Sequence, residues 1–342
     1  MTRTAILLHN LGGPTRREEM EPFLRALFED PEIFRLPLSR WTQGPFARWL
    51  ARRRADEAWA NYERIGGSPL LEWTRLQAEG LAMGLAETMD PESFLVLPAM
   101  RYSSPSIREA LEAARDFGAE RILSFPLYPH YSLATTGSSE RELLRRLEEM
   151  SWNPELRRIE SWATEPDYLD CLAWRLRRCL DRLDPNLRSR TRIVYAAHGT
   201  PLSFVRRGDP YVPQIEACLL GVEERVPHGL RHSLAWQSRV GPMAWTRPYL
   251  DEEVSRLGRE GLRCLVVVPL SFVSDHVETL YELDILTRNQ AERAGIREFH
   301  RVPSLNADPD FLGVLTHLAG EALADPAPSN PAHSPKGDRR AG

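Results

Sequence analysis

The chain has 342 residues, of which 42% are hydrophobic and 27% charged, a composition typical of a soluble globular protein with room for two domains. Its formal net charge of −4 gives no basic surface for nucleic acid. No window approaches the roughly 18 apolar residues of a membrane span, and we expect no signal peptide. The four scattered cysteines form no C-x-x-C pair, so we expect reduced thiols and a cytoplasmic location.

The first half of the chain alternates strands with helices. A strand at Ala5–His9 meets the turn Asn10–Pro14, and another strand follows at Arg121–Leu127. Between them, the apolar spacing of Ser106–Arg115 predicts an amphipathic helix that ends near Gly118. Strands that alternate with such helices predict a parallel sheet with helices on both faces.

The segment 31–54 in this half is apolar and basic. The dipeptide 44–45 (Gly-Pro) predicts a helix start, after which Phe46, Trp49 and Leu50 share one face. One interpretation is an ordinary amphipathic helix packed on the core. The other is an apolar lip with a basic rim, at the mouth of a cleft, that rests on a membrane surface.

The second half repeats the plan. A strand at Arg192–Ala197 meets the turn His198–Pro201, and a helix that ends near Gly261 precedes a strand that reaches Pro269. We therefore expect an α/β fold of two similar Rossmann-like domains, with parallel sheets flanked by helices and a cleft between them. The expected divisions are residues 1–150, residues 151–325 and a disordered, Pro/Ser-rich tail at 326–342.

An apparent helix rich in acids follows the buried strand Leu265–Val268. At about 100° per residue, Asp275, Glu278 and Glu282 lie within about 60° of one another on a helical wheel, and His276 stands beside them. At the C-terminal edge of a sheet, such a cluster can bind a cation or take up protons. The alternative is a capping box, with Asp275 as N-cap and Glu278 three residues later.

His198 also follows a strand, so we expect it to face the same opening. Taken alone, it fits a structural histidine satisfied by a backbone partner. Opposite an acidic helix it becomes a candidate base or a ligand for Fe²⁺. The glycine turns contain neither G-x-G-x-x-G nor a P-loop, so a dinucleotide or triphosphate site is not supported.

Seven motifs, spread in order over about residues 4–320, resemble those of the ferrochelatase family. They are Asn10–Pro14, Met100–Tyr102, Pro126–Pro129 with Thr135–Ser139, Ala197–Pro201, Arg207–Tyr211, Trp236–Pro242 and Phe272–Asp284. The resemblance implies an enzyme of haem biosynthesis that inserts Fe²⁺ into a porphyrin. It also implies a fold of the class II chelatase type, with Fe²⁺ as a substrate and no permanently bound cofactor.

The resemblance assigns roles by position. His198 and Glu278 match the catalytic and iron-binding pair, with the division of labour between them left open. Asp275, His276 and Glu282 match a proton or metal path. The residues matched to porphyrin binding are Leu11, Arg54, Tyr62, Ser68, Arg101 and Tyr128.

The chain departs from the family pattern at several positions. Leu286 stands where some relatives continue the row of acids, and His130 stands where glutamine is usual. The Gly-Gly-Ser segment that ends at Ser68 is one residue short. The C-terminal cysteine cluster of some relatives has no counterpart, so we expect no iron–sulfur centre.

The apolar lip favours protoporphyrin IX as substrate, with coproporphyrin III as the alternative. Two other possibilities are an inactive haem- or porphyrin-binding protein and a chelatase that inserts cobalt into a different tetrapyrrole. We expect a monomer or weak dimer without a nucleic-acid partner, and peripheral membrane contact through the lip.

Overall fold

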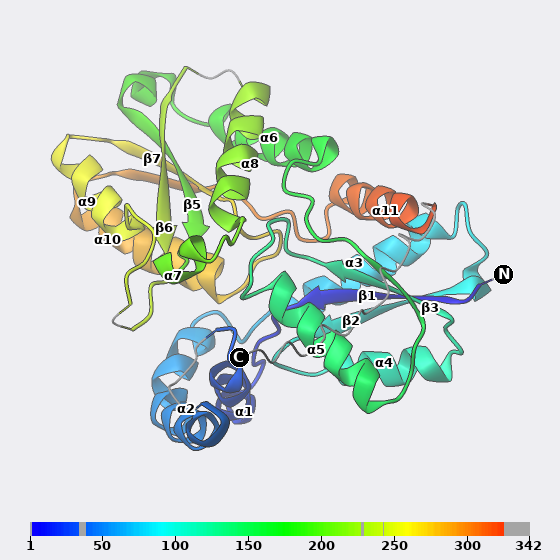
Figure 1. Cartoon of the computed structure of the whole chain (residues 1–342). Coiled ribbons are helices and arrows are strands. Elements are labelled where there is room, and N and C mark those ends of the chain that lie inside the picture. Colours follow the sequence, from blue (N-terminus) through cyan, green and yellow to red (C-terminus); the bar gives the residue numbers. More distant parts are fainter. Residues whose placement is uncertain (1, 34–38, 227–228, 242, 325–342) are drawn as a thin grey trace, which may run out of the picture.

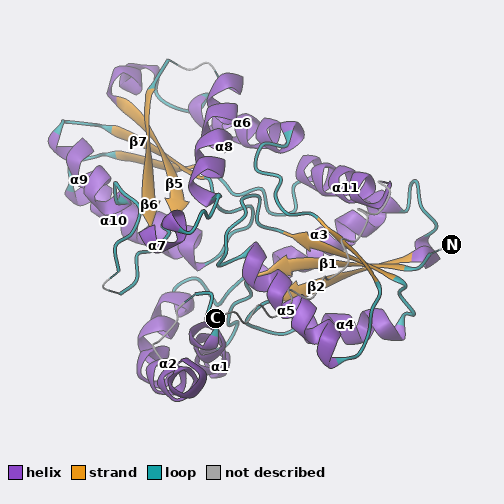
Figure 2. Ribbon diagram, in the orientation of Figure 1, coloured by secondary structure: helices purple, strands orange, loops and turns teal. Residues whose placement is uncertain are grey.

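Two four-stranded parallel sheets form the frame of the protein (Figures 1 and 2). The computed structural model describes residues 2–33, 39–226, 229–241 and 243–324. The first sheet has the order β2 (Phe94–Met100), β1 (Thr4–Asn10), β3 (Arg121–Pro126), β4 (Glu155–Arg158). The second has the order β6 (Arg231–Gln237), β5 (Thr191–His198), β7 (Cys264–Pro269), β8 (Glu298–Arg301). Both sheets share one topology, which confirms the predicted repeat.

Helices cover both faces of each sheet. The α-helices are α1 (Arg17–Glu29), α2 (Ser39–Glu63), α3 (Leu70–Leu85), α4 (Ile107–Asp116), α5 (Thr136–Glu149), α6 (Pro166–Leu180), α7 (Leu202–Arg206), α8 (Tyr211–Arg225), α9 (Leu250–Arg259), α10 (Arg288–Arg293) and α11 (Pro309–Ala324). The described residues also form the 3₁₀ turns η1 (Pro91–Ser93) and η2 (Pro185–Arg190) and the π-helix η3 (Glu278–Thr287). The start of α4 follows local chemistry, because Ser106 and Glu109 form a reciprocal capping box.

Alternation along the central strands builds the core. In β1, Ile6 and Leu8 face one side and Ala5 and Leu7 the other, as the two-residue period of a strand requires. The side that holds Ile6 packs against α3 and α11, and the other side packs against α4 and α5. The cluster around Ile6 also contains Tyr195 of β5, so one hydrophobic core joins the two sheets.

Helices α1 and α2 pack against each other beside the first sheet (Figure 1). The predicted helix start at 44–45 is wrong, because α2 begins at Ser39 and contains Pro45. Its residues Ala47 and Ala51 are fully buried, whereas Trp49 is exposed, so the interpretation in which the aromatic face packs on the core is not supported. Part of the lip, residues 34–38, lies outside the described residues.

The predicted division at residue 150 does not match the sheets, since β4 pairs with β3 of the first sheet. Helix α11, near the other end of the chain, packs against α3 and β3 of the first domain. The first domain therefore draws on both halves of the sequence. The predicted tail, 326–342, lies outside the described residues.

Candidate active site

His198 is the last residue of β5, so it stands at the C-terminal edge of the second sheet. Its Nδ1 donates a hydrogen bond to the carbonyl oxygen of Gly199 at 2.6 Å, which leaves Nε2 with a free lone pair in the neutral ring. Burial lowers the pKa of His198, against the opposing effects of Gly199 and Glu282. The imidazole is therefore neutral near pH 7, and its side chain is 36% exposed, so a ligand can reach it.

Two side chains behind His198 fix its backbone. The N–H of His198 donates to Oγ of Ser271 at 3.0 Å, and the hydroxyl of Tyr211 donates to the His198 carbonyl at 3.1 Å. The two hydroxyls lie 2.6 Å apart. Neither residue was among the predicted site residues, although Tyr211 ends one of the seven motifs.

Glu278 begins η3 and faces His198. Its Oε1 lies 3.7 Å from Nε2 of His198. Burial raises the pKa of Glu278 to about 8, so the carboxyl keeps its proton near neutral pH. Among the described residues, its Oε2 has no hydrogen-bond partner. A buried oxygen without a partner is costly and marks a position that a ligand or water can satisfy.

Two further groups border Glu278. Glu282, four residues along η3, accepts hydrogen bonds from Ser238 at 2.5 Å and from Gln237 at 3.1 Å. Burial and the charge of Glu278 raise the pKa of Glu282 to about 7. His276 places Nε2 3.9 Å from Oε2 of Glu278, and burial lowers its pKa to about 4. All four titratable side chains thus lie close together, as predicted.

Asp275 differs from the other acids. Its oxygens accept hydrogen bonds from Thr279, Arg301, Ser304 and Asn306 at 2.8–3.0 Å. Burial alone would raise the pKa of Asp275, but the charge of Arg301 and these bonds hold it below its ordinary value. Asp275 is therefore an anion bound by its neighbours.

The helical-wheel prediction and the capping-box alternative both need correction. The predicted helix is a π-helix that starts at Glu278, so Asp275 precedes it and turns toward Arg301. A wider helix also changes the angle between successive side chains. Asp275 is not the N-cap, because that position is Val277, which makes no side-chain cap bond.

Residues of the first domain gather at the turn after β1. A Cβ atom at Gly12, whose φ is +85°, would lie 2.2 Å from Oγ of Ser103, and one at Gly13 would lie 2.5 Å from Oγ of Ser68. Glycine is therefore required at both positions. Leu11 in the same turn belongs to an apolar cluster with Tyr62.

Tyr62 of the first domain lies near the acids of the second. Burial raises its pKa, and the charges of Glu278 and Glu282 add to the effect. Its ring is 3.7 Å from the Cβ position of Gly13. Tyr62 therefore lies between the turn of the first domain and the acids of the second.

The two predicted propionate arginines have different surroundings. Arg101, 16% exposed, donates to Asp30 at 2.7 Å and to Ser138 at 2.8 Å. Asp30 is buried and also accepts from the hydroxyls of Tyr102 and Ser138. Arg54 lies on the exposed face of α2, 4.0 Å from Glu57. Arg101 thus has a structural partner that the sequence analysis missed.

Tyr128, the remaining predicted porphyrin residue, follows β3 at the start of the loop to α5. Burial raises the pKa of Tyr128, while the neighbouring hydroxyl of Ser139 and the charge of Arg101 oppose the rise, so both residues lie near it. Apart from each other, the hydroxyls of Tyr128 and of Ser139, in α5, have no hydrogen-bond partner among the described residues.

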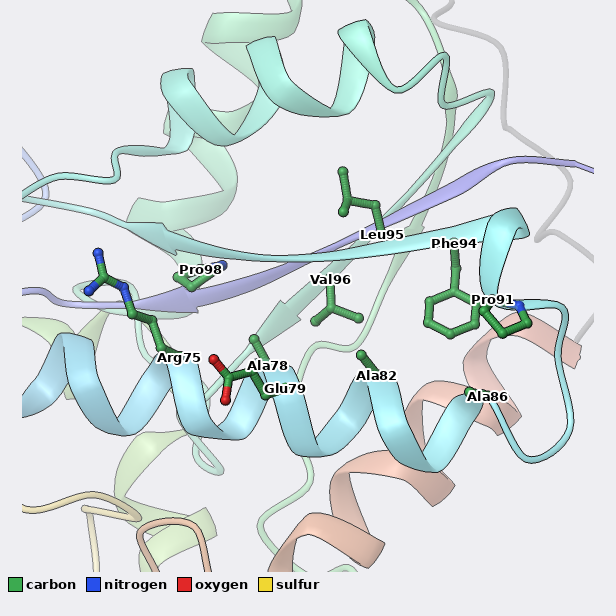
Figure 3. Close-up of a pocket in the computed structure, with 10 residues that line it drawn as sticks. All are labelled: Arg75, Ala78, Glu79, Ala82, Ala86, Pro91, Phe94, Leu95, Val96 and Pro98. Atoms are coloured by element: carbon green, nitrogen blue, oxygen red, sulfur yellow. The ribbon is translucent and has the colours of Figure 1, made fainter.

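A surface pocket of about 510 Å³ lies elsewhere, between α3 and the edge strand β2 (Figure 3). Its walls include Arg75, Glu79 and Phe94, and none of the predicted site residues. Among the described residues, no group of three or more His, Cys, Asp or Glu side chains is arranged to hold a metal ion. No helix in the described part of the chain has the length and apolarity to cross a membrane.

Comparison with known proteins identifies the family. The ferrochelatase family model matches residues 3–323. A ferrochelatase from Synechocystis is 43% identical over 334 residues, covering 95% of this chain and 84% of the relative. One from Synechococcus is 43% identical over 338 residues, covering 96% of both.

The chain belongs to the ferrochelatase family. The resemblance drawn from the motifs is thereby confirmed, and with it a metal-insertion enzyme of haem biosynthesis that takes a porphyrin and iron as substrates.

Solved structures agree with the predicted ferrochelatase fold. SirB from Bacillus subtilis with Fe³⁺ gives a TM-score of 0.55 at 12% identity, covering 95% of this chain and 96% of that one. A sirohydrochlorin chelatase SirB in complex with cobalt, from the subspecies spizizenii, gives 0.53 at 11% identity, covering 94% and 95%. The chelatase fold with two Rossmann-like domains is confirmed.

Proposed function

We propose that His198 and Glu278 perform the insertion of Fe²⁺ and that His198 is the first proton acceptor. The observation that carries the proposal is the 3.7 Å pairing of Nε2 with Oε1, beside Tyr62 of the first domain. Metallation removes two pyrrole N–H protons and directs nitrogen lone pairs to the ion, with no change in oxidation state. A neutral imidazole accepts such a proton, whereas Glu278, with a pKa of about 8, still holds its own.

Glu278 acts in a second step of this proposal. An approaching Fe²⁺ favours the carboxylate over the acid, so Glu278 passes its proton to Glu282 and becomes a ligand, while His198 releases the first pyrrole proton to solvent and accepts the second. Glu282, with a pKa of about 7, is suited to receive protons and release them near neutral pH. His276 is neutral and adjacent to Glu278. We assign Asp275 to holding the loop rather than to carrying protons.

We favour protoporphyrin IX as the porphyrin because α2 exposes two tryptophans near its N-terminal end. Trp41 is 78% exposed and Trp49 is 55% exposed. Such a surface suits a substrate with two vinyl groups and two propionates better than one with four propionates. Arg54, exposed on the same helix, is suited to bind one propionate.

The same α2 surface supports peripheral membrane contact by an otherwise cytoplasmic protein. Exposed tryptophans favour the membrane interface, and Arg52 and Arg53 lie on the same helix. The expected monomer or weak dimer, and the expected lack of an iron–sulfur centre, stay predictions.

Metallation assays test this function. We expect the purified protein to insert Fe²⁺, or Zn²⁺ as a substitute, into protoporphyrin IX, which an inactive haem-binding protein would not do. Under detergent-matched conditions, kcat/KM for protoporphyrin IX should exceed that for coproporphyrin III. A preference of about tenfold for coproporphyrin III would overturn the substrate assignment.

A further inference from the structure

Gln77 is a buried polar residue that links the two domains. It lies on α3 of the first domain and is 0% exposed. Its Nε2 donates to Oγ of Ser274 at 2.9 Å and to the carbonyl oxygen of Asn306 at 2.7 Å, both in the second domain. Buried donors that reach across a domain boundary fix the position of the groups that accept from them.

The acceptors of Gln77 are directly joined to the loop that precedes Glu278. The side chain of Asn306 donates to Oδ2 of Asp275 at 2.9 Å and accepts from its backbone N–H at 2.8 Å. The carbonyl oxygen of Ser274 accepts from Nδ1 of His276 at 3.0 Å. Every residue from 274 to 276 is thus bonded to Gln77 or to one of its partners.

The same face of α3 also holds the turn of the first domain. Thr74, three residues before Gln77, accepts a hydrogen bond from Nδ2 of Asn10 at 3.0 Å. Oδ1 of Asn10 in turn accepts from the backbone N–H of Leu11 at 2.8 Å. Residues three apart on a helix are neighbours. One turn of α3 therefore connects the Leu11 turn to the Glu278 loop.

We propose that Gln77 is a positioning residue, which sets the Glu278 loop relative to the Leu11 turn. The inference rests on the proposed role of Glu278 in metallation. Leu11 and Glu278 stand on different domains, so their separation depends on contacts that cross the boundary. A shift of about 1 Å in a reacting group can cost about 100-fold in rate, and two buried hydrogen bonds can prevent such a shift.

The test replaces Gln77 by methionine, which has a similar shape and no donor. A matched control is Gln290→Met, which also removes two donated bonds, to the Asp251 carbonyl at 2.6 Å and to Ser255 at 3.0 Å, on α10 away from the site. We expect Gln77→Met to lower kcat for metallation about 10- to 100-fold, with the porphyrin KM within about twofold of wild type. The control variant Gln290→Met should keep the wild-type kcat and porphyrin KM.

A second measurement does not depend on activity. Amide hydrogen exchange in Gln77→Met should accelerate at Asp275 and Asn306, whose N–H groups donate within this network, and stay unchanged in the control. A double-mutant cycle with Ser274→Ala should give non-additive losses in kcat, because both changes remove the same contact.

The outcomes separate the two claims. A wild-type protein without metallation would refute the proposed function, and the exchange measurement would still decide the role of Gln77. If Gln77→Met keeps wild-type kcat and wild-type exchange at both amides, the positioning role is refuted. If the porphyrin KM of Gln77→Met rises by as large a factor as kcat falls, the positioning role is also refuted, because Gln77 would then contact the substrate.

Discussion

At the residue scale, three neighbouring groups differ in protonation because they differ in surroundings. Burial makes His198 a neutral base and keeps Glu278 protonated, with a pKa of about 8. The pKa of Glu282, also raised by burial, is about 7. Pairs of groups whose environments separate their pKa values are typical of acid–base sites.

Replacing Glu278 by glutamine should separate catalysis from stability. The folded pKa of about 8 lies above the ordinary value of 4.5, so the native state keeps a proton that the unfolded chain releases. The contribution of this proton to the free energy of unfolding is complete below pH 4.5. It is lost as the pH rises to about 8, at up to about 1.4 kcal/mol per pH unit.

We therefore expect the melting temperature of Glu278→Gln, relative to wild type, to increase between about pH 5 and pH 8. Its kcat should fall about 100-fold or more, because the amide has no acidic proton to release and cannot become an anionic ligand for Fe²⁺. Calorimetry at both pH values and a metallation assay check this. A constant difference in melting temperature would show that Glu278 ionises normally.

Arg54 and Arg101 should respond differently to alanine. Loss of Arg101 leaves Asp30 buried without its cation, so we expect a destabilisation of about 3–5 kcal/mol. Arg54→Ala should leave the melting temperature unchanged and raise the porphyrin KM. A porphyrin diester should bind wild type weakly and be insensitive to Arg54→Ala. Equal melting temperatures for the two variants would contradict the structural role of Arg101.

The sequence predicted which side chains lie together in the site, but not which contacts hold each one in position. The positions of His198 and Glu278 after strands, together with the motifs, were enough to place them in one site. The partner of Arg101 was not predictable, because Asp30 lies 71 residues away and carries no local signal. The pKa values likewise depend on burial, which spacing does not reveal.

At the element scale, two helices differ from prediction. The spacing of the acids at 275, 278 and 282 fits an α-helix, yet the segment Glu278–Thr287 is a π-helix. Helix α2 begins before the start predicted at 44–45, and its Ala51 packs in the cluster that contains Met20 and Phe23 of α1. Local patterns identify helices well and their packing faces less well.

Exposed tryptophans on α2 give a prediction for the lip. We expect the double change Trp41→Ser and Trp49→Ser to weaken co-sedimentation with anionic vesicles about tenfold or more, since interfacial binding scales with apolar area. The melting temperature should stay the same, because both side chains are exposed. The control is Trp174→Ser, which removes a 42% exposed tryptophan from α6. If Trp174→Ser weakens vesicle co-sedimentation as much as the double change does, the lip has no special role in membrane binding.

At the scale of the whole molecule, repetition of one plan in the two halves was predictable from spacing, but the strand order and the path of α11 were not. Helix α11 returns to the first domain because Phe311 and Leu315 fill the core beside its sheet. No feature of α11 alone indicates which sheet it covers. Consequently the two domains share a core although each has its own sheet.

A shared core predicts one cooperative unfolding transition. Phe311 is fully buried and packs near Trp162, with ring centroids 6.0 Å apart. We expect Phe311→Ala to cost about 3–5 kcal/mol and to move a single calorimetric transition to lower temperature. Separate transitions, only one of them shifted, would show that the domains unfold independently.

The most direct test of the account is anaerobic Fe²⁺ insertion by wild type and His198→Ala. We expect the wild type to form haem from protoporphyrin IX. The variant should lose about 100-fold or more in kcat while its affinity for porphyrin, measured by fluorescence, stays near wild type, because the imidazole acts on the protons and the ion rather than on the propionates. A variant that keeps half of the wild-type turnover would contradict the central claim.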